Sequence, residues 1–247
     1  RLLIILLSPL LLGHILWKTI SNKHSRYLWQ RLGLRPGSLP KNSLWFHCAS
    51  VGEVNTVIPL LKNLHKKNSK LSFIISTNTI TGASVVQQEN LNYLSHCYLP
   101  FDWSININRF LSTVKPTALF VLETEIWPNL FAACHNKNIP LHIINARLSN
   151  KTTATKSWIK KLLKNSLSHV TSIQARSESD AQRYISLGAD EKIINVAGNL
   201  KFTTTLNTNT SITSSTFYSD REYVLLASTH EDEEANIYKL WEELNRD

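Results

Sequence analysis

Residues 46–55 read Phe-His-Cys-Ala-Ser-Val-Gly-Glu-Val-Asn, a short apolar run that stops at small residues and continues into a segment carrying one carboxylate, Glu53. The run 44–48 is too short for a helix and rich in strand-favouring residues, whereas apolar residues from Val54 to Leu64 recur at helical spacing. This pattern predicts a strand, a turn and a helix in succession. In an open α/β sheet, ligands bind at the carboxyl ends of strands beside helix N-termini, so the turn is a candidate site.

Glu53 and Gly52 are the candidate functional residues of this turn. Gly52 would let a substrate approach the backbone closely, and the first free N–H groups of the helix would face the same space as the Glu53 carboxylate. A carboxylate there suits a general base or a group that holds a ribose hydroxyl. The alternative is that Glu53 only complements the helix dipole, as acidic residues in first turns commonly do.

The same alternation of short apolar runs and helical patterns continues along the chain. Further strands are predicted at 71–76, 95–99, 118–122, 141–145, 169–174 and 193–197, and helices near 83–89, 105–114, from 128, at 156–164 and at 178–187. The strands are continuously apolar rather than alternating, which is typical of a mainly parallel sheet covered by helices on both faces. The predicted fold class is α/β, with a parallel-sheet domain over 21–202.

The first residues favour a membrane anchor. Residues 2–17 are almost wholly apolar, and five basic residues follow that run, namely Lys18, Lys23, Arg26, Arg31 and Arg35. The run is shorter than the roughly 20 residues that span a bilayer, so we expect an anchor over 1–20 that is completed by preceding residues. A signal peptide is the competing interpretation, but no small-residue cleavage site follows. The charge bias places the rest of the chain in the cytoplasm.

Composition narrows the class of protein. The 247 residues, 43% of them hydrophobic, suffice for one large domain or for one domain and part of another. The chain has no Met and stops within a helical pattern, so we expect a fragment of a longer protein. Its three cysteines, Cys48, Cys97 and Cys134, are far apart and lie among apolar residues, which indicates a reducing compartment without a disulfide framework. The nine histidines lack metal-binding spacing, so no metal is expected.

The net charge of +9 raises the question of an anionic partner. No RNA- or DNA-binding signature accompanies the charge, which is not confined to one stripe, so nucleic acid is not expected. An anionic membrane surface is the simpler partner, and residues 156–164 read as a basic amphipathic helix that could lie near lipid headgroups. The equally weighted alternative is a helix packed on the sheet with its lysines in water.

The last part of the chain predicts a linker and a second domain. Residues 203–219 are dominated by Thr, Ser and Asn, which is typical of an interdomain linker. A strand at 223–227 and a helix start at 228–234, with capping hydroxyls and first-turn acids, follow it. We therefore expect residues 220–247 to begin a second α/β domain.

Polar and small residues follow four of the predicted strands, and at this point a family resemblance emerges. They are SVGE at 50–53, TNTITG at 77–82, ETEIWPN at 123–129 and NARLS at 145–149. Together with the apolar start, LPFD at 99–102, GNLKF at 198–202 and STHE at 228–231, they make the chain resemble the Kdo transferases of lipopolysaccharide synthesis. Those are membrane-associated enzymes that attach 3-deoxy-D-manno-octulosonic acid (Kdo) to lipid A precursor. The motifs occur in the family's order over almost the whole chain.

The resemblance implies an inverting glycosyltransferase of the GT-B type with a Rossmann-like amino-terminal domain, and no cofactor is expected. Its amino-terminal domain would receive the acceptor, lipid A precursor (lipid IVA), and its carboxyl-terminal domain the donor, CMP-Kdo. Glu53 matches the family's catalytic base, which would take a proton from an acceptor hydroxyl as that oxygen attacks the anomeric carbon of Kdo. Glu123 and Lys201 match positions assigned to transition-state stabilisation. Without the resemblance, a helix-start acid and a solvated lysine would be the ordinary interpretations of these two.

Further residues follow from the same resemblance. Ser50 and Gly52 are expected to bind substrate. Ser228, Thr229 and His230 are expected at the cleft between domains, where a helix N-terminus can receive a phosphate, although an ordinary capped helix is the alternative. Asp232 stands where the family often has Gly, so no tight-turn role is assigned to it, and Trp127 and Pro128 are expected to be packing and helix-start residues.

Two expectations concern how the enzyme works. The helix terminus that keeps Glu53 ionised also lowers its basicity, so base strength is expected only when a lipid-linked acceptor desolvates the carboxylate. The expected location is the cytoplasmic face of the inner membrane, and this chain alone is expected to be inactive.

The alternative function is a non-catalytic, membrane-tethered α/β module that binds a nucleotide or anionic lipid. An NAD-type reductase is disfavoured because no G-x-G-x-x-G follows the first strand.

Overall fold

The computed structural model describes residues 25–35, 37–201 and 232–244. The chain divides into two compact units, 1–207 and 208–247, and each is considered by itself. The predicted anchor at 1–20, the linker at 203–219 and the strand at 223–227 lie outside the described residues. Among the described helices, none has the length and apolar character needed to cross a bilayer.

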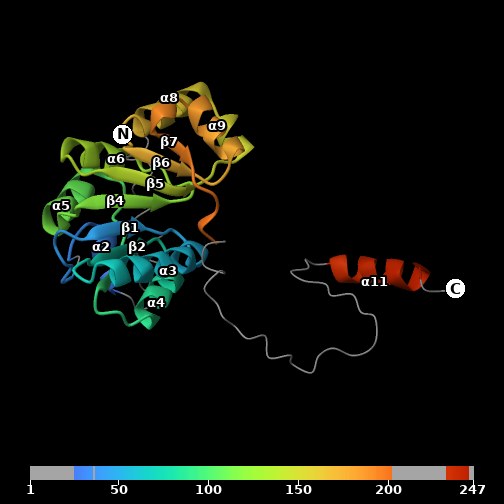
Figure 1. Cartoon of the computed structure of the whole chain (residues 1–247), viewed down its shortest axis with the longest axis horizontal. Helices are drawn as coiled ribbons and strands as arrows, with labels where there is room; N and C mark the ends of the chain where they lie inside the picture. The colour runs from blue at the N-terminus through green and yellow to red at the C-terminus, as the bar shows by residue number, and fades with distance from the viewer. Residues whose placement is uncertain (1–24, 36, 202–231, 245–247) are drawn as a thin grey trace. The chain divides into compact units, whose positions relative to one another are not determined.

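The first unit is built on a parallel sheet with the strand order β3-β2-β1-β4-β5-β6-β7 (Figure 1). Its strands are β1 Leu44–His47, β2 Phe73–Thr77, β3 Leu94–Tyr98, β4 Ala118–Leu122, β5 Leu141–Ala146, β6 Ser172–Ala175 and β7 Ile194–Val196. All seven coincide with predicted strands to within a few residues, which confirms the parallel α/β fold class. The order reverses between β1 and β4, the position where open sheets of this kind bind their ligands.

Helices connect the strands in the order that parallel pairing requires. In this unit they are α2 Ser25–Arg31, α3 Val51–Lys67, α4 Ile80–Gln88, α5 Ser104–Val114, α6 Pro128–Asn136, α7 Asn150–Thr153, α8 Ser157–Leu167, α9 Glu178–Ser186 and the 3-10 turn η1 Glu191–Ile193. The sequence did not predict α2, α7 or η1. Each spans two turns or fewer, too short for a periodic pattern.

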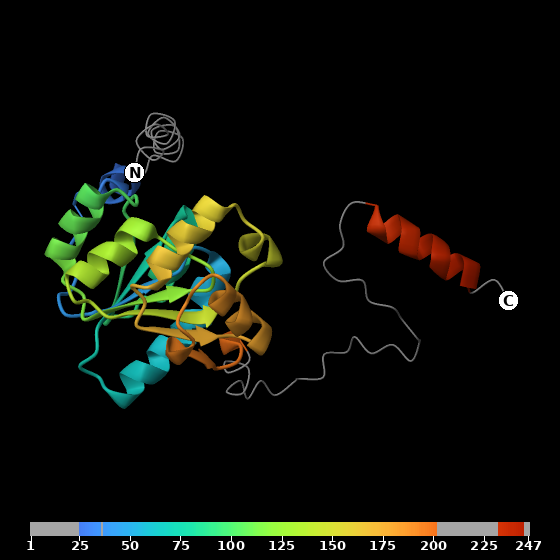
Figure 2. The ribbon, with the colours of Figure 1, turned by 90° about the horizontal axis from the view of Figure 1, so that it is seen from above.

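Both faces of the sheet are buried, as predicted. Trp45 and Leu119 belong to a core that includes α5 and α6, whereas their chain neighbours Phe46 and Phe120 pack on the opposite side with α3. This alternation follows from the two-residue repeat of a strand. Figure 2 shows α5, α6 and α8 together on one side of the sheet.

The basic helix α8 packs on the domain, and a position near lipid headgroups stays a prediction. Leu167 is fully buried and Leu163 packs against the core, so the helix is docked on the domain. Trp158 and Leu162 nevertheless remain 59% and 42% exposed on a helix with four lysines nearby. The helix is therefore packed at one end and presents apolar and basic side chains to solvent at the other.

The second unit contributes one described element, α11 Glu233–Leu244. It begins near the predicted helix start, with Glu233 and Glu234 in its first turn. Acidic residues there interact favourably with the helix dipole.

Candidate functional site

The carboxyl ends of β1, β2, β4 and β5 bring the four polar motifs to one edge of the sheet. The strands are neighbours in the order β2-β1-β4-β5, and they run parallel, so the residues that follow them lie side by side. Strands are spaced about 4.8 Å apart, which places side chains of adjacent motifs within contact range. The expected convergence at this edge is thus confirmed.

Glu53 lies in the first turn of α3 and is only 8% exposed. Its Oε2 accepts a hydrogen bond from the Ala49 N–H at 2.8 Å, and its Oε1 accepts one from Ser50 Oγ at 2.9 Å. Ser50 is the N-cap of α3, and its Oγ accepts in turn from the Glu53 N–H at 3.3 Å. This reciprocal arrangement resembles a capping box, except that the carboxylate accepts from the N–H of Ala49 rather than from that of the N-cap residue Ser50, so Glu53 does serve the helix end. It also fixes the carboxylate in one position at the sheet edge.

The pKa of Glu53 is raised above its usual value, chiefly because burial disfavours the charged carboxylate. The hydrogen bonds from Ala49 and Ser50 oppose this effect, while the negative charges of Glu123 and Glu125 add to it. The fold itself thus supplies part of the desolvation, which the sequence pattern could not reveal. The expectation that base strength develops only with acceptor bound stays a prediction.

Glu123 follows β4 and meets two cations. Its Oε1 lies 3.9 Å from Lys201 Nζ, and its Oε2 lies 3.6 Å from Arg147 Nε. The Lys201 side chain is half exposed, whereas that of Glu123 is 14% exposed. Two of the predicted catalytic residues, which lie far apart in the sequence, are thus brought together, and the electrostatic influence of Glu123 on Glu53 links them to the third.

The backbone is strained where β4 and β5 end. Glu123 has φ 57° and Asn145 has φ 51°, both in the left-handed region that non-glycine residues rarely adopt. Surrounding contacts hold them there. Glu123 N donates to Ile144 O at 3.1 Å, and Asn145 Oδ1 accepts from Leu200 N at 3.2 Å. Such strain costs about 1–3 kcal/mol per residue and clusters at functional sites.

Of the predicted substrate-binding residues, Ser50 and Gly52 lie in the part of the chain that the structure describes. A Cβ at Gly52 would meet no atom nearer than Ser50 Oγ at 3.9 Å, so the fold does not demand glycine there. That open space suits a close approach by substrate, which stays a prediction, as does binding by Ser50. The other three predicted substrate-binding residues, Ser228, Thr229 and His230, lie outside the described residues.

His47 and Glu125 belong to the same edge but were given no role by the sequence analysis. His47 is fully buried, and its Nδ1 lies 3.0 Å from Ser76 Oγ. Its Nε2 is 3.9 Å from Glu125 Oε2. Both residues sit in motifs already quoted, His47 at the end of the first strand and Glu125 in ETEIWPN, so the strand-end rule would have found them.

Asp102, of the LPFD motif, has a structural role. Its Oδ2 accepts from Asn129 N at 2.9 Å and its Oδ1 from Leu130 N at 2.7 Å, which satisfies free N–H groups at the start of α6. Pro128 is the first residue of α6 and Trp127 packs against the core, as expected for both. Two motifs of the chain are thus joined for stability.

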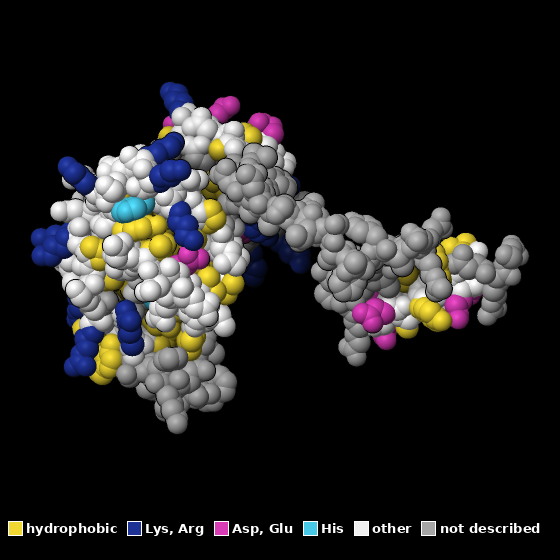
Figure 3. All heavy atoms as spheres, turned by 60° about the horizontal axis from the view of Figure 1, so that its bottom comes forward, with side chains coloured by type: hydrophobic (Ala, Val, Ile, Leu, Met, Phe, Trp, Pro, Cys, Tyr) yellow, Lys and Arg dark blue, Asp and Glu magenta, His cyan; other side chains and the backbone are white. Residues whose placement is uncertain are grey.

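The described residues contain neither a cluster of potential metal ligands nor a disulfide. Within the described ranges, no group of three or more His, Cys, Asp or Glu side chains could hold a metal ion. Cys48, Cys97 and Cys134 are buried and unpaired. Lysine and arginine side chains are spread over the face of the molecule seen in Figure 3 rather than gathered in a stripe.

Comparisons with known proteins point in one direction. A family model described as 3-deoxy-D-manno-octulosonic-acid transferase (kdotransferase) matches residues 26–204. The 3-deoxy-D-manno-octulosonic acid transferase of Haemophilus influenzae is 34% identical over 249 residues, covering 96% of this chain and 57% of that relative. The protein of the same name from Rickettsia typhi is 34% identical over 203 residues, covering 80% and 43%. The chain therefore spans about half the length of these relatives.

Among solved structures, the UDP-GlcNAc 2-epimerase of Neisseria meningitidis is similar to this chain with a TM-score of 0.48 and 14% identity. The match covers 64% of this chain and 47% of that one.

Proposed function

Because the chain belongs to the 3-deoxy-D-manno-octulosonic-acid (Kdo) transferase family, we propose that it forms the acceptor-side part of a glycosyltransferase that adds Kdo in lipopolysaccharide synthesis. In this proposal the donor is CMP-Kdo and the acceptor is lipid A precursor, lipid IVA. The reaction proceeds with inversion at the anomeric carbon of Kdo. The architecture proposed for the whole enzyme is GT-B, with residues 220–247 beginning the donor-binding domain.

The observation that carries the proposal is the environment of Glu53. Its carboxylate is buried at the carboxyl edge of the sheet, held by two hydrogen bonds, and its pKa is raised. An ionised carboxylate has about four lone-pair sites, so two remain for a substrate after Ala49 and Ser50 have donated. A raised pKa brings a carboxylate closer to the value that suits a general base near neutral pH.

Glu53 acts in one proton transfer. It takes the proton of an acceptor hydroxyl while that oxygen forms a bond to the anomeric carbon of Kdo, and the bond from that carbon to the CMP phosphate breaks. The proton ends on Glu53, and the electron pair leaves with CMP. Because both carboxylate oxygens are anchored by the start of α3, little reorganisation is needed when the hydroxyl arrives.

Glu123 and Lys201 are assigned to the charges that develop in this step. Positive charge grows on the sugar ring as CMP departs, and the Glu123 carboxylate can oppose it or hold the acceptor. Lys201 can neutralise negative charge on the departing phosphate or on the Kdo carboxylate. Their proximity, 3.9 Å between Nζ and Oε1, keeps both charges in place before substrate binds.

We further propose that the enzyme works at the cytoplasmic face of the inner membrane. The apolar run at 2–17 supplies an anchor, and the exposed Trp158 and Leu162 of α8, with neighbouring lysines, suit an anionic membrane surface. A membrane-bound enzyme meets a lipid acceptor in two dimensions. In the same proposal Ser228, Thr229 and His230 contact the donor phosphate.

Mass spectrometry of the lipid product tests the function. Full-length protein is incubated in detergent with CMP-Kdo and lipid IVA, and the lipid fraction is analysed for a mass increase of Kdo residues. Kdo-modified lipid with release of CMP supports the proposal. Binding of CMP or of anionic lipid without any modified product would contradict it and favour the non-catalytic membrane-tethered module.

A further inference from the structure

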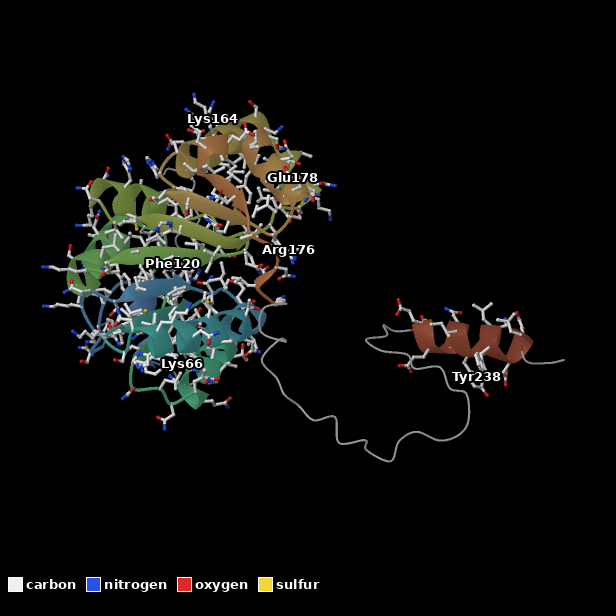
Figure 4. The ribbon with its side chains drawn as sticks, in the orientation of Figure 1. Lys66, Phe120, Lys164, Arg176, Glu178 and Tyr238 are labelled. Carbon is white, nitrogen blue, oxygen red and sulfur yellow. The ribbon has the colours of Figure 1, made fainter. Side chains whose placement is uncertain are left out.

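A polar hollow of about 550 Å³ lies next to the site described above. It opens at the ends of β4, β5 and β6, and its lining includes Thr124, Arg147, Arg176 and Arg183. Thr124 follows Glu123 directly, and Arg147 contacts Glu123 at 3.6 Å, so the hollow adjoins the proposed catalytic carboxylates. Figure 4 places Arg176 at the edge of the sheet toward which the strands point.

The lining carries more positive than negative charge. Asp180 is the single acidic residue in it, beside three arginines. Although burial raises the pKa of Asp180, hydrogen bonds from Ser177 Oγ and Leu148 N and the charges of Arg176 and Arg183 hold that pKa below its usual value. Asp180 is thus ionised and already bonded, and the lining retains an excess of positive charge.

Arg147 and Arg176 are the arginines best placed to bind a ligand. Arg183 is engaged, because its Nη1 donates to Asp180 at 3.0 Å and its Nε to Asn150 at 2.9 Å. Within the described part of the chain, Arg147 and Arg176 each face one carboxylate, with Nε at 3.6 and 3.9 Å from its oxygen, which is too long for a hydrogen bond. A guanidinium carries five N–H donors in a planar fork, so the four terminal donors of each remain for an anion.

We propose that this hollow binds a phosphate monoester of the acceptor, an inference that rests on the proposed function. A phosphate monoester carries a charge of about −1.5 to −2 at neutral pH, close to the excess positive charge of the lining, whereas a carboxylate would leave part of it uncompensated. Its three terminal oxygens can accept from both arginines at once. Arginine forks match phosphate geometry better than any other side chain.

The spacing of the strands gives the approximate distance between the bound phosphate and Glu53. Glu53 follows β1, Arg147 follows β5 two strands away, and Arg176 follows β6 three strands away. At about 4.8 Å per strand, these positions lie roughly 10–14 Å from the strand end that carries Glu53. The phosphate is therefore remote from the hydroxyl that is attacked, so it orients the acceptor and takes no part in the chemistry.

The test combines a protein change with a matched change in the ligand. Binding of full-length protein to detergent micelles containing lipid IVA is compared with binding to micelles containing its dephosphorylated form, for wild type, Arg176→Gln and Arg176→Lys. Arg109→Gln, an exposed arginine on α5, is the control for charge alone. Thermal melts establish that the variants are folded, and the KM for CMP-Kdo is measured in parallel.

We expect wild type to bind the phosphorylated lipid about tenfold more tightly, the effect of one charge-assisted pair. Arg176→Gln should lose most of that preference, because only the fork of Arg147 remains, Arg176→Lys should keep more of it, and Arg109→Gln should behave as wild type. Equal weakening toward both lipids, no change in Arg176→Gln, or a raised KM for CMP-Kdo instead would overturn the inference. If the protein transfers no Kdo but still shows a phosphate preference that depends on Arg176, the proposed function is wrong and the phosphate site stands.

Discussion

Acidification should destabilise this protein through His96, a buried histidine of β3. Its side chain is 93% shielded from solvent, its Nε2 lies 2.9 Å from Thr77 Oγ1, and its Nδ1 has no hydrogen-bond partner within the described residues. Burial, assisted by the charge of Arg26, lowers its pKa from 6.5 to about 3. Protonation would place an unsolvated charge between β3 and its neighbours.

The sign and size of the effect follow from the two pKa values. Between pH 6.5 and about 3 the unfolded chain binds a proton at His96 that the folded chain does not, so the free energy of unfolding falls as pH falls. At pH 5 the gap of 1.5 pH units below the ordinary pKa of 6.5 corresponds to a loss of about 2 kcal/mol. The loss is absent above pH 7.5.

Urea unfolding of wild type and His96→Asn at pH 7.5 and pH 5 measures this quantity. Other titrating groups affect both proteins equally, so the variant should lose about 2 kcal/mol less than wild type on acidification. His135→Asn, which removes an exposed histidine and relieves only the smaller of the two causes that lower the pKa of His169, should keep a dependence close to that of wild type. If His96→Asn and wild type lose the same free energy to within about 0.5 kcal/mol, the burial argument is refuted.

Two further predictions concern a glycine of the fold, with a matched control, and a carboxylate of the site. Gly33→Ala should cost about 2–4 kcal/mol in urea unfolding, because Gly33 has φ +68° and a Cβ would meet Asn106 O at 2.6 Å. Gly37→Ala, at φ +84° with no atom nearer than 3.7 Å, should cost only about 1–2 kcal/mol, and equal losses would contradict the steric argument. Glu123→Gln in the full-length protein should lower kcat for Kdo transfer roughly 100-fold while the melting temperature stays within a few degrees, and an unchanged kcat would remove Glu123 from the mechanism.

The sheet could be predicted because its central strands β1, β2 and β4 are largely apolar runs bounded by turns. Trp45 and Phe46 illustrate the reason, since neighbours that are both apolar must both be buried, and in the structure they face opposite cores. The short helices could not be predicted in this way. The helix α2, for example, is held by Tyr27, which stacks edge-on against Tyr98 of β3, and that contact depends on the tertiary fold.

The position of the site could be predicted from the sequence, but its detailed geometry could not. Strand ends are readable in the sequence, so Glu53 and Glu123 could be placed at one edge, and the family resemblance assigned their roles. The left-handed backbone of Glu123, the burial of Glu53 and the pairing with Lys201 depend on distances that no local pattern encodes. Arg176 follows the sixth strand directly, so the rule that found the other motifs would have found it as well.

The central claim is that Glu53 is the general base of a Kdo transferase, and kcat of the Glu53→Gln variant tests it most directly. Glutamine is nearly isosteric, and its amide oxygen can still accept from Ala49 N, so the start of α3 should stay folded while the base is lost. The account predicts that full-length Glu53→Gln loses about 10²–10⁴-fold in kcat with CMP-Kdo and lipid IVA, at an unchanged melting temperature. Turnover within a few-fold of wild type would contradict it.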